Sequence, residues 1–141
     1  MTQQEERYWA IIPAAGVGVR MGADVPKQYL LLNDKPILEH TIDLIANHQK
    51  IEKVVVVLHA HDHHWQHLKS AQSDKIITVV GGSSRAKSVM LGLECIQNIT
   101  AAHDWVLVHD AVRPCLTQSQ LSSFIDRLNH HTVGGLLGLP I

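Results

Sequence analysis

The sequence predicts an α/β domain in which a mostly parallel sheet carries helices on both faces, a Rossmann-like arrangement. Short, continuous runs of apolar and β-branched residues, such as residues 53–58 (KVVVVL), recur along the chain. Such runs are typical of strands that are buried on both faces of a parallel sheet. They alternate with segments of helical periodicity, and this alternation indicates parallel strands with helical crossovers. A glycine-rich segment follows the first run, as in many folds of this class.

The expected elements follow from these patterns in chain order. We expect strands at residues 8–13, 53–58, 75–80, 104–109 and 133–139. Apolar pairs spaced by four predict a helix at residues 36–47, and a weaker pattern predicts one at 62–70. A helix at residues 84–97 is expected to turn one stripe inward: Ala86, Val89, Met90, Leu93 and Ile96, with Cys95 close to the core. Thr117 and Gln120 fit a capping box for a helix at residues 117–128.

Composition limits the class of protein. The 141 residues are 45% hydrophobic and carry 12 basic and 13 acidic side chains, which predicts one globular domain over residues 1–141. The near-zero net charge argues against general nucleic-acid binding but is compatible with a single anionic ligand. Two cysteines are too few for a disulfide framework, so we expect a reduced, cytoplasmic setting. We expect no membrane association, because the longest apolar stretch is far too short to span a bilayer.

The segment after the first expected strand has the composition of a phosphate-binding loop. It reads G-x-G-x-x-x-G from Gly16 to Gly22, one residue longer than the dinucleotide fingerprint, and it lacks the Gly-Lys-Ser/Thr of a Walker loop. Small residues let backbone N–H groups approach an anion closely. Arg20 and Lys27 add two cations that suit a phosphorus centre. The alternative is a plain tight turn beside two solvated cations.

Polar residues also follow the third and fourth expected strands. Gly82 is followed by Arg85 and Ser88, which share one face of the first turn of a helix and suit a base edge or a phosphate. Asp110 follows the strand at 104–109, where a lone carboxylate is a frequent Mg²⁺ ligand beside a nucleoside triphosphate. The alternatives are an ordinary capped helix start at Ser84, and an aspartate that caps a turn or pairs with Arg113.

Five of the eleven histidines lie within residues 59–67, and a sixth, His48, lies upstream of this segment. His63 and His67 would be one turn apart on a helix, so a metal site is one interpretation. The segment is polar and has little other ligand chemistry, which favours a solvated helix face. Neither cysteine has an obvious base beside it, so the sequence does not favour a thiol mechanism.

Taken together, these motifs resemble the 2-C-methyl-D-erythritol 4-phosphate cytidylyltransferase family of the non-mevalonate isoprenoid pathway. The matching segments are residues 13–21 (PAAGVGVRM), 26–29 (PKQY), 37–40 (ILEH), 81–89 (GGSSRAKSV) and 108–114 (VHDAVRP). Each segment alone is weak, but their order and spacing together are specific. Ser83 departs from the pattern, since relatives often carry an acidic residue there.

The resemblance implies a nucleotidyltransferase-type fold and a Mg²⁺-dependent reaction of CTP with methylerythritol phosphate that yields the CDP-alcohol and pyrophosphate. It implies that Arg20 and Lys27 stabilise the transition state, that Asp110 holds Mg²⁺, and that Arg113 shapes the acceptor side. It also implies contacts to the nucleotide from a further set: Ala14, Ala15, Gly16, Gly82, Arg85, Ser88 and Ala111.

Family members are longer than this chain, so the resemblance implies the N-terminal portion of the family domain. The remainder carries the dimer arm, and the full-length protein is expected to be a homodimer. Three alternatives stay open at this point. They are a ribitol-phosphate or other sugar-phosphate nucleotidyltransferase, an inactive CTP-binding fragment, and a dinucleotide-dependent dehydrogenase, which the loop length disfavours.

Overall fold

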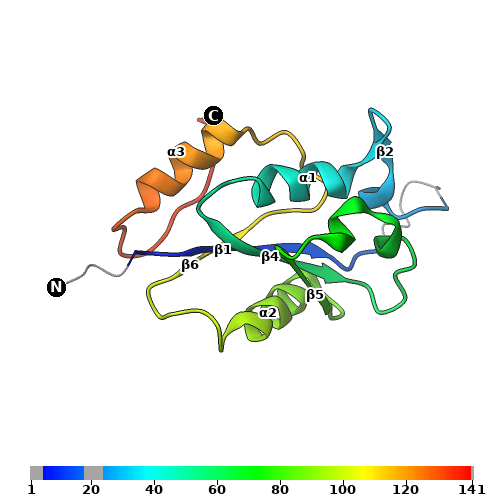
Figure 1. Ribbon diagram of the computed structural model, residues 1–141, viewed down its shortest axis with the longest axis horizontal. Coiled ribbons are helices and arrows are strands. Elements are labelled where there is room, and N and C mark those ends of the chain that lie inside the picture. The colour runs from blue at the N-terminus through cyan, green and yellow to red at the C-terminus, as the bar shows by residue number, and fades with distance from the viewer. Residues whose placement is uncertain (1–4, 18–23, 141) are drawn as a thin grey trace.

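The computed structural model describes residues 5–17 and 24–140, and its centre is a parallel sheet (Figure 1). The four strands are β1 (Tyr8–Ala14), β4 (Ile51–Leu58), β5 (Ile76–Val80) and β6 (Trp105–Val108), in the spatial order β5-β4-β1-β6. Every neighbouring pair is parallel. The expected fold class is therefore confirmed, and the first four expected strands are correct to within two residues at each end.

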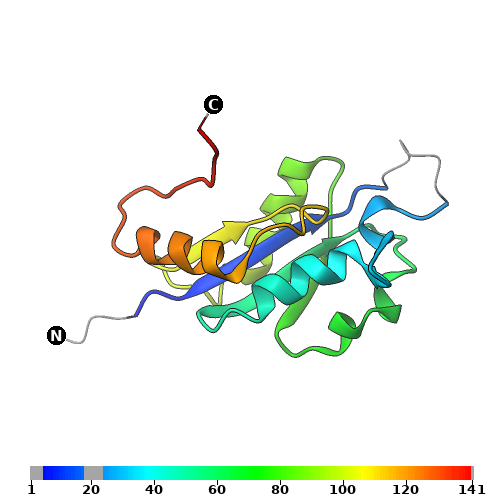
Figure 2. The ribbon, with the colours of Figure 1, turned by 90° about the horizontal axis from the view of Figure 1, so that it is seen from above.

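Helices cover both faces of this sheet. Helix α1 (Ile37–Ala46) and helix α3 (Gln118–Leu128) lie on one face, and α2 (Arg85–Ile96) lies on the other (Figures 1 and 2). The capping box of α3 is present, with the Thr117 hydroxyl accepting from the Gln120 N–H. A small hairpin of β2 (Leu31–Leu32) and β3 (Lys35–Pro36) precedes α1.

The two central strands form both halves of the core because their side chains alternate between the faces. Ile12, Val54 and Val56 face α1 and α3, whereas Ile11, Val55 and Val57 face α2. All six are fully buried. Burial on both faces explains why these strands are continuous apolar runs in the sequence.

The strand order indicates where a ligand-binding cleft is expected. From β1 the chain steps outward to β4 and β5, and it then crosses back to β6 on the other side of β1. The reversal falls between β1 and β6, and the residues that directly follow these two strands line one cleft at the carboxyl edge of the sheet. This reversal of strand order is where parallel α/β proteins bind their ligands.

Two expected elements are wrong. Residues 133–139 form no strand; they are extended coil in which Leu136 and Leu139 are 96% and 91% exposed. A strand needs a neighbour to satisfy its backbone groups, and none of the described strands pairs with this segment.

The expected helix at 62–70 is two short 3-10 helices, η3 (Trp65–His67) and η4 (Lys69–Gln72). The Asp62 carboxylate accepts the N–H groups of His64 and Trp65, and such local bonding favours a turn over an α-helix.

The inward face of α2 also differs from the prediction. Ser88, Gly92 and Ile96 are its buried residues, whereas Cys95, Met90 and Leu93 are exposed and Ala86 lies on the surface. Gly92 sits so close to the sheet that an added Cβ would lie 3.0 Å from Cγ2 of Ile11. With Gly92 this close to Ile11, the buried face of α2 is the one that carries Ser88, Gly92 and Ile96, and Met90 and Leu93 point away from the sheet.

None of the helices in the described part of the chain is both long and apolar enough to cross a membrane.

Candidate functional site

A cleft of about 640 Å³ opens at the carboxyl edge of the sheet, above the ends of β1 and β6. It brings together every predicted site residue that the structure describes. These residues are Ala14, Ala15, Gly16, Lys27, Gly82, Arg85, Ser88, Asp110, Ala111 and Arg113. Arg20 lies outside the described residues. Segments that are up to a hundred residues apart in the sequence thus meet at one site, as the strand-end rule predicts.

The loop after β1 is held from below by a buried glutamine. Nε2 of Gln28 donates to the carbonyl oxygens of Ala14 at 2.9 Å and Gly16 at 3.1 Å. The Gln28 side chain is buried and comes from the short 3-10 helix η2 (Lys27–Tyr29). The amide therefore joins η2 to the glycine-rich loop.

Lys27 precedes this glutamine on η2 and its side chain lines the cleft. None of the hydrogen bonds and ion pairs found among residues 5–17 and 24–140 involves its ammonium group. Tyr29 fixes the other end of η2, since its hydroxyl donates to the Asp62 carboxylate at 2.6 Å. Burial, followed by this hydrogen bond, raises the pKa of Tyr29, so the phenol stays a donor.

The start of α2 forms the opposite wall. The Ser84 hydroxyl caps the helix by accepting from the Lys87 N–H, so the capped helix start that was one of the alternatives is present. Ser88 is buried, and its hydroxyl oxygen accepts from the Gly82 N–H at 3.2 Å. Gly81 is tightly packed, because an added Cβ would lie 2.5 Å from Cβ of Ala15. Gly81 therefore allows the loop after β5 to contact the loop after β1.

Asp110 is the acidic centre of the cleft and pairs with both nearby arginines. Nε and Nη2 of Arg85 donate to its Oδ1 at 3.1 and 2.7 Å. Nε of Arg113 lies 3.0 Å from its Oδ2. The pairing with Arg113, one of the alternatives for this aspartate, is thus present, and Arg85 adds a second partner that sequence spacing does not indicate.

These partners decide the charge of the cleft. The hydrogen bonds from Arg85 hold the pKa of Asp110 below its ordinary value, against the opposing effect of burial. Asp110 is the sole carboxylate among the described lining residues, against three cations: Lys27, Arg85 and Arg113. The net positive charge suits a polyphosphate. A single ionised carboxylate also fits Mg²⁺, which commonly takes one or two carboxylates plus phosphate oxygens.

The histidine-rich segment does not gather into a metal site in the described residues, where no three His, Cys, Asp or Glu side chains are grouped for one. The His59 ring accepts from the His61 N–H, and the His64 ring packs 4.9 Å from that of Tyr29. His59 nevertheless lines the cleft. His59 directly follows β4, and this position at the end of a strand was the sequence signal that it lies at the cleft. The surrounding histidine-rich run suggested a metal site or a solvated helix face instead.

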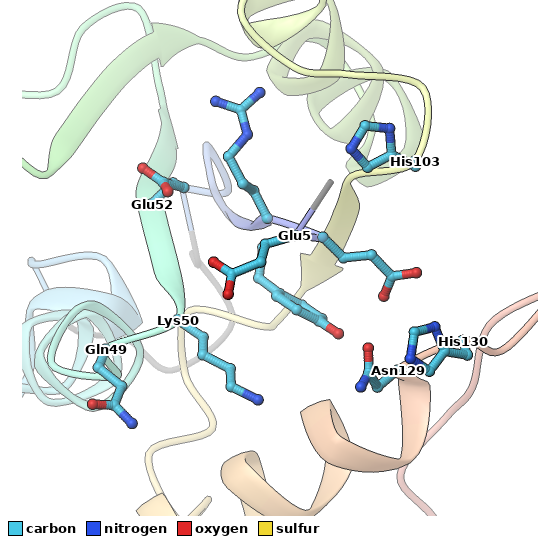
Figure 3. Close-up of a pocket in the computed structure, with 10 residues that line it drawn as sticks. Glu5, Gln49, Lys50, Glu52, His103, Asn129 and His130 are labelled. Atoms are coloured by element: carbon cyan, nitrogen blue, oxygen red, sulfur yellow. The ribbon is translucent and has the colours of Figure 1, made fainter. Parts of the chain in front are cut away.

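A second pocket, of about 560 Å³, lies at the opposite, amino edge of the sheet (Figure 3). Glu5, Lys50 and His103 are among its lining residues. Both of its cations are paired within the protein, Arg7 with Asp104 and Lys50 with Asp126, and Glu6 accepts from the Trp105 indole. It contains no glycine-rich loop, and it is not at the end where parallel sheets bind ligands.

Fold and cleft together define a class: a Rossmann-like α/β domain in which the beginning of a glycine-rich segment (residues 14–17), a cluster of cations and one carboxylate face a common cleft. Comparison with known protein families identifies the family within this class. Residues 8–141 match the family model for 2-C-methyl-D-erythritol 4-phosphate cytidylyltransferase, and the chain belongs to this family.

Curated relatives agree with this assignment. The 2-C-methyl-D-erythritol 4-phosphate cytidylyltransferase of Hahella chejuensis is 43% identical over 99% of this chain and 58% of its own length. The protein of the same name from Shewanella piezotolerans is 45% identical over 100% of this chain and 59% of its own length. The chain thus spans about three fifths of the length of these relatives.

Solved structures agree as well. A crystal structure of 4-diphosphocytidyl-2C-methyl-D-erythritol synthase superposes with a TM-score of 0.82 at 28% identity, covering 97% of this chain and 61% of the other. The Francisella tularensis 2-C-methyl-D-erythritol 4-phosphate cytidylyltransferase gives a TM-score of 0.73 at 32% identity, covering 90% and 54%.

Proposed function

We propose that the cleft binds CTP with Mg²⁺ and that the protein transfers CMP to 2-C-methyl-D-erythritol 4-phosphate, releasing pyrophosphate. The product would be 4-diphosphocytidyl-2-C-methyl-D-erythritol, an intermediate of non-mevalonate isoprenoid biosynthesis. One observation carries the proposal: in a member of this family, three cations, one carboxylate and the glycine-rich loop converge on one cleft.

The proposed roles are those that the family resemblance implies, and the position of these residues around one cleft supports them. The backbone of Ala14, Ala15 and Gly16 holds the triphosphate, because small residues allow close approach of their amides. A second group of residues, on the α2 side and after β6, contacts the nucleoside: Gly82, Arg85, Ser88 and Ala111. Arg113, at the outer end of the cleft, faces the acceptor.

The chemistry needs no general base. The attacking group is a phosphate monoester that is already ionised near neutral pH, and one of its oxygens bonds to the α-phosphorus of CTP as the bond to pyrophosphate breaks. Catalysis then consists of alignment and charge stabilisation. Lys27, with Arg20, neutralises the negative charge that builds on the α-phosphoryl oxygens.

Asp110 is the proposed ligand of Mg²⁺. When bound, the ion would neutralise phosphate charge and help to align the triphosphate. Asp110 must then exchange at least one of its arginine partners, which frees a guanidinium for the nucleotide. This exchange of partners between partly exposed groups has a low cost, since such ion pairs contribute about 1 kcal/mol or less.

Two other functions are compatible with the same cleft. The acceptor could be ribitol phosphate or another sugar phosphate, because the described lining residues offer mainly Arg113 to the acceptor. A chain of this length could also bind CTP without turning it over.

We further propose a homodimer for the full-length protein and a cytoplasmic location, with no nucleic-acid partner.

The test is pyrophosphate release from CTP and Mg²⁺, with methylerythritol phosphate and ribitol phosphate assayed side by side. It should be run on this chain and on the full-length Hahella chejuensis relative. Release that depends on methylerythritol phosphate supports the proposal. Preference for ribitol phosphate would reassign the acceptor, and CTP binding without release by this chain would indicate a binding fragment.

A further inference from the structure

The glycine-rich loop has a support that the proposed chemistry does not use. The carbonyl oxygens of Ala14 and Gly16 lie two residues apart, and both point at one side-chain amide, that of Gln28. An amide nitrogen carries two hydrogens and no charge, so it can satisfy two carbonyls at once. Gln28 is only 5% exposed, and a lysine or arginine in its place would have to bury a charge.

Holding these two oxygens also orients the loop. In a trans peptide, C=O and N–H point in opposite directions. The oxygens that face Gln28 therefore direct the N–H groups of Ala15 and Val17 away from it. Both residues line the cleft, so these two N–H groups are among the backbone donors available to an anion there.

The same bonds fix the position of Lys27. Gln28 follows Lys27 directly on η2, whose three residues are too few to hold a position by themselves. Gln28 ties η2 to the loop, and Tyr29 ties it to Asp62. The distance between the Lys27 backbone and the loop amides is thereby set by one buried side chain.

We propose that Gln28 is a positioning residue that holds the phosphate-facing amides and Lys27 in one rigid unit before nucleotide binds. This inference rests on the proposed function, since it assigns the loop to the triphosphate. Removal of the amide should then leave a folded protein that has lost a preorganised loop, and binding would have to supply the ordering.

Calorimetric CTP titrations with Mg²⁺ compare the wild-type chain with Gln28→Met, which keeps the length of the side chain but has no donor. Ser70→Ala is the matched control, because Ser70 is also 5% exposed and its hydroxyl donates to the buried Glu39 carboxylate, outside the cleft. We expect Gln28→Met to weaken CTP binding about tenfold or more, and Ser70→Ala to change it less than about twofold, at similar losses in Tm. Equal CTP affinity in wild type and Gln28→Met would overturn the inference, as would an equal loss in the control.

A second measurement needs no nucleotide. The backbone amide of Gly16 should have an order parameter of about 0.85 in the wild type and below about 0.6 in Gln28→Met. An unchanged value would overturn the proposed positioning role. If Gln28→Met does not fold, Gln28→Asn replaces it under the same criteria, since its shorter amide cannot reach both carbonyls. Failure of the wild type to bind CTP, with an ordered loop that depends on Gln28, would contradict the proposed function and leave the loop support standing.

Discussion

Arg85 and Asp110 join the beginning of α2 to the end of β6. Two guanidinium nitrogens of Arg85 donate to a single carboxylate oxygen, Oδ1 of Asp110, at 3.1 and 2.7 Å. The two residues are 25 positions apart in the sequence, and Arg113 occupies the other oxygen of the same carboxylate. Asp110, the predicted metal ligand, is therefore held by Arg85 and Arg113, the predicted contacts to the nucleotide and the acceptor. Substitution of Asp110 alone separates its role from theirs.

Asp110→Asn should weaken CTP binding in Mg²⁺ by about tenfold or more, because an amide cannot replace the charge of a metal ligand. The free energy of unfolding should change by about 1 kcal/mol or less, since the lost ion pairs are partly exposed. Calorimetry and chemical denaturation measure the two effects. Asp126→Asn, which breaks the exposed pair with Lys50, is the matched control. Wild-type affinity in Asp110→Asn would remove Asp110 from the proposed site.

Lys27→Ala should lower turnover by about a hundredfold or more, with a smaller effect on CTP affinity, because its charge is needed most as the α-phosphoryl group reacts. Pyrophosphate release by this chain, or by a full-length relative with the same lysine, measures it. Lys69→Ala removes an exposed lysine outside the cleft and should have no effect. Near-normal turnover in Lys27→Ala would refute the mechanism as stated.

Two glycines of the site should respond to alanine in opposite ways. At Gly81 an added Cβ would lie 2.5 Å from Ala15 and 2.7 Å from Oγ of Ser88, so Gly81→Ala should destabilise the fold by about 1–3 kcal/mol. At Gly16 no atom of the described residues lies within 4 Å of an added Cβ. Gly16→Ala should therefore fold normally and bind CTP about tenfold more weakly, because only a ligand needs the space.

Thermal melts and CTP titrations separate these effects. A large loss of Tm in Gly16→Ala would show that the glycine serves the fold. Unchanged CTP affinity in the same variant would show that the nucleotide does not approach the loop closely.

His48 should make stability depend on pH. Burial, followed by the charge of Lys50, lowers the pKa of His48 from its ordinary value of 6.5, while Asp126 acts in the opposite direction. Its Nδ1 accepts from the Lys50 N–H, and this bond is lost when the ring takes up a second proton. A lowered pKa contributes stability above pH 6.5 that is lost as pH falls through the folded-state value.

The measurement is Tm between pH 8 and pH 5. The wild type should lose stability below about pH 6.5, and His48→Gln, which keeps a donor toward Ser122, should show a flatter dependence. Identical slopes in the two proteins would mean that His48 does not titrate with unfolding.

Sequence patterns sufficed for the parallel sheet because its strands are buried on both faces, and burial leaves continuous apolar runs such as those of β1 and β4. Residues 133–139 are also apolar, but they include three glycines and have no partner strand in the described structure. Local sequence does not report whether a partner strand exists. Met90 and Leu93 were misassigned for a related reason, since Gly92 and Ile11 set the rotation of α2 by a contact between distant segments.

The site was predictable where position along a strand was sufficient. Lys27, Arg85 and Asp110 all follow strand ends or the loop after β1, and all three line the cleft. The ion pair of Arg85 with Asp110 was not predictable, because it depends on how α2 is placed against β6. Gln28 lay inside a recognised motif, but its burial and its two bonds to the loop are visible only in three dimensions.

The central claim is that CTP binds at the carboxyl edge of the sheet, and amide chemical-shift mapping tests it most directly. On addition of CTP and Mg²⁺, shifts should concentrate at residues 14–17, 82–85, 88 and 110–113, which line the cleft. Residues around the amino-edge pocket, such as Lys50 and His130, should not move. No shifts at all, or shifts confined to the amino-edge pocket, would contradict the account.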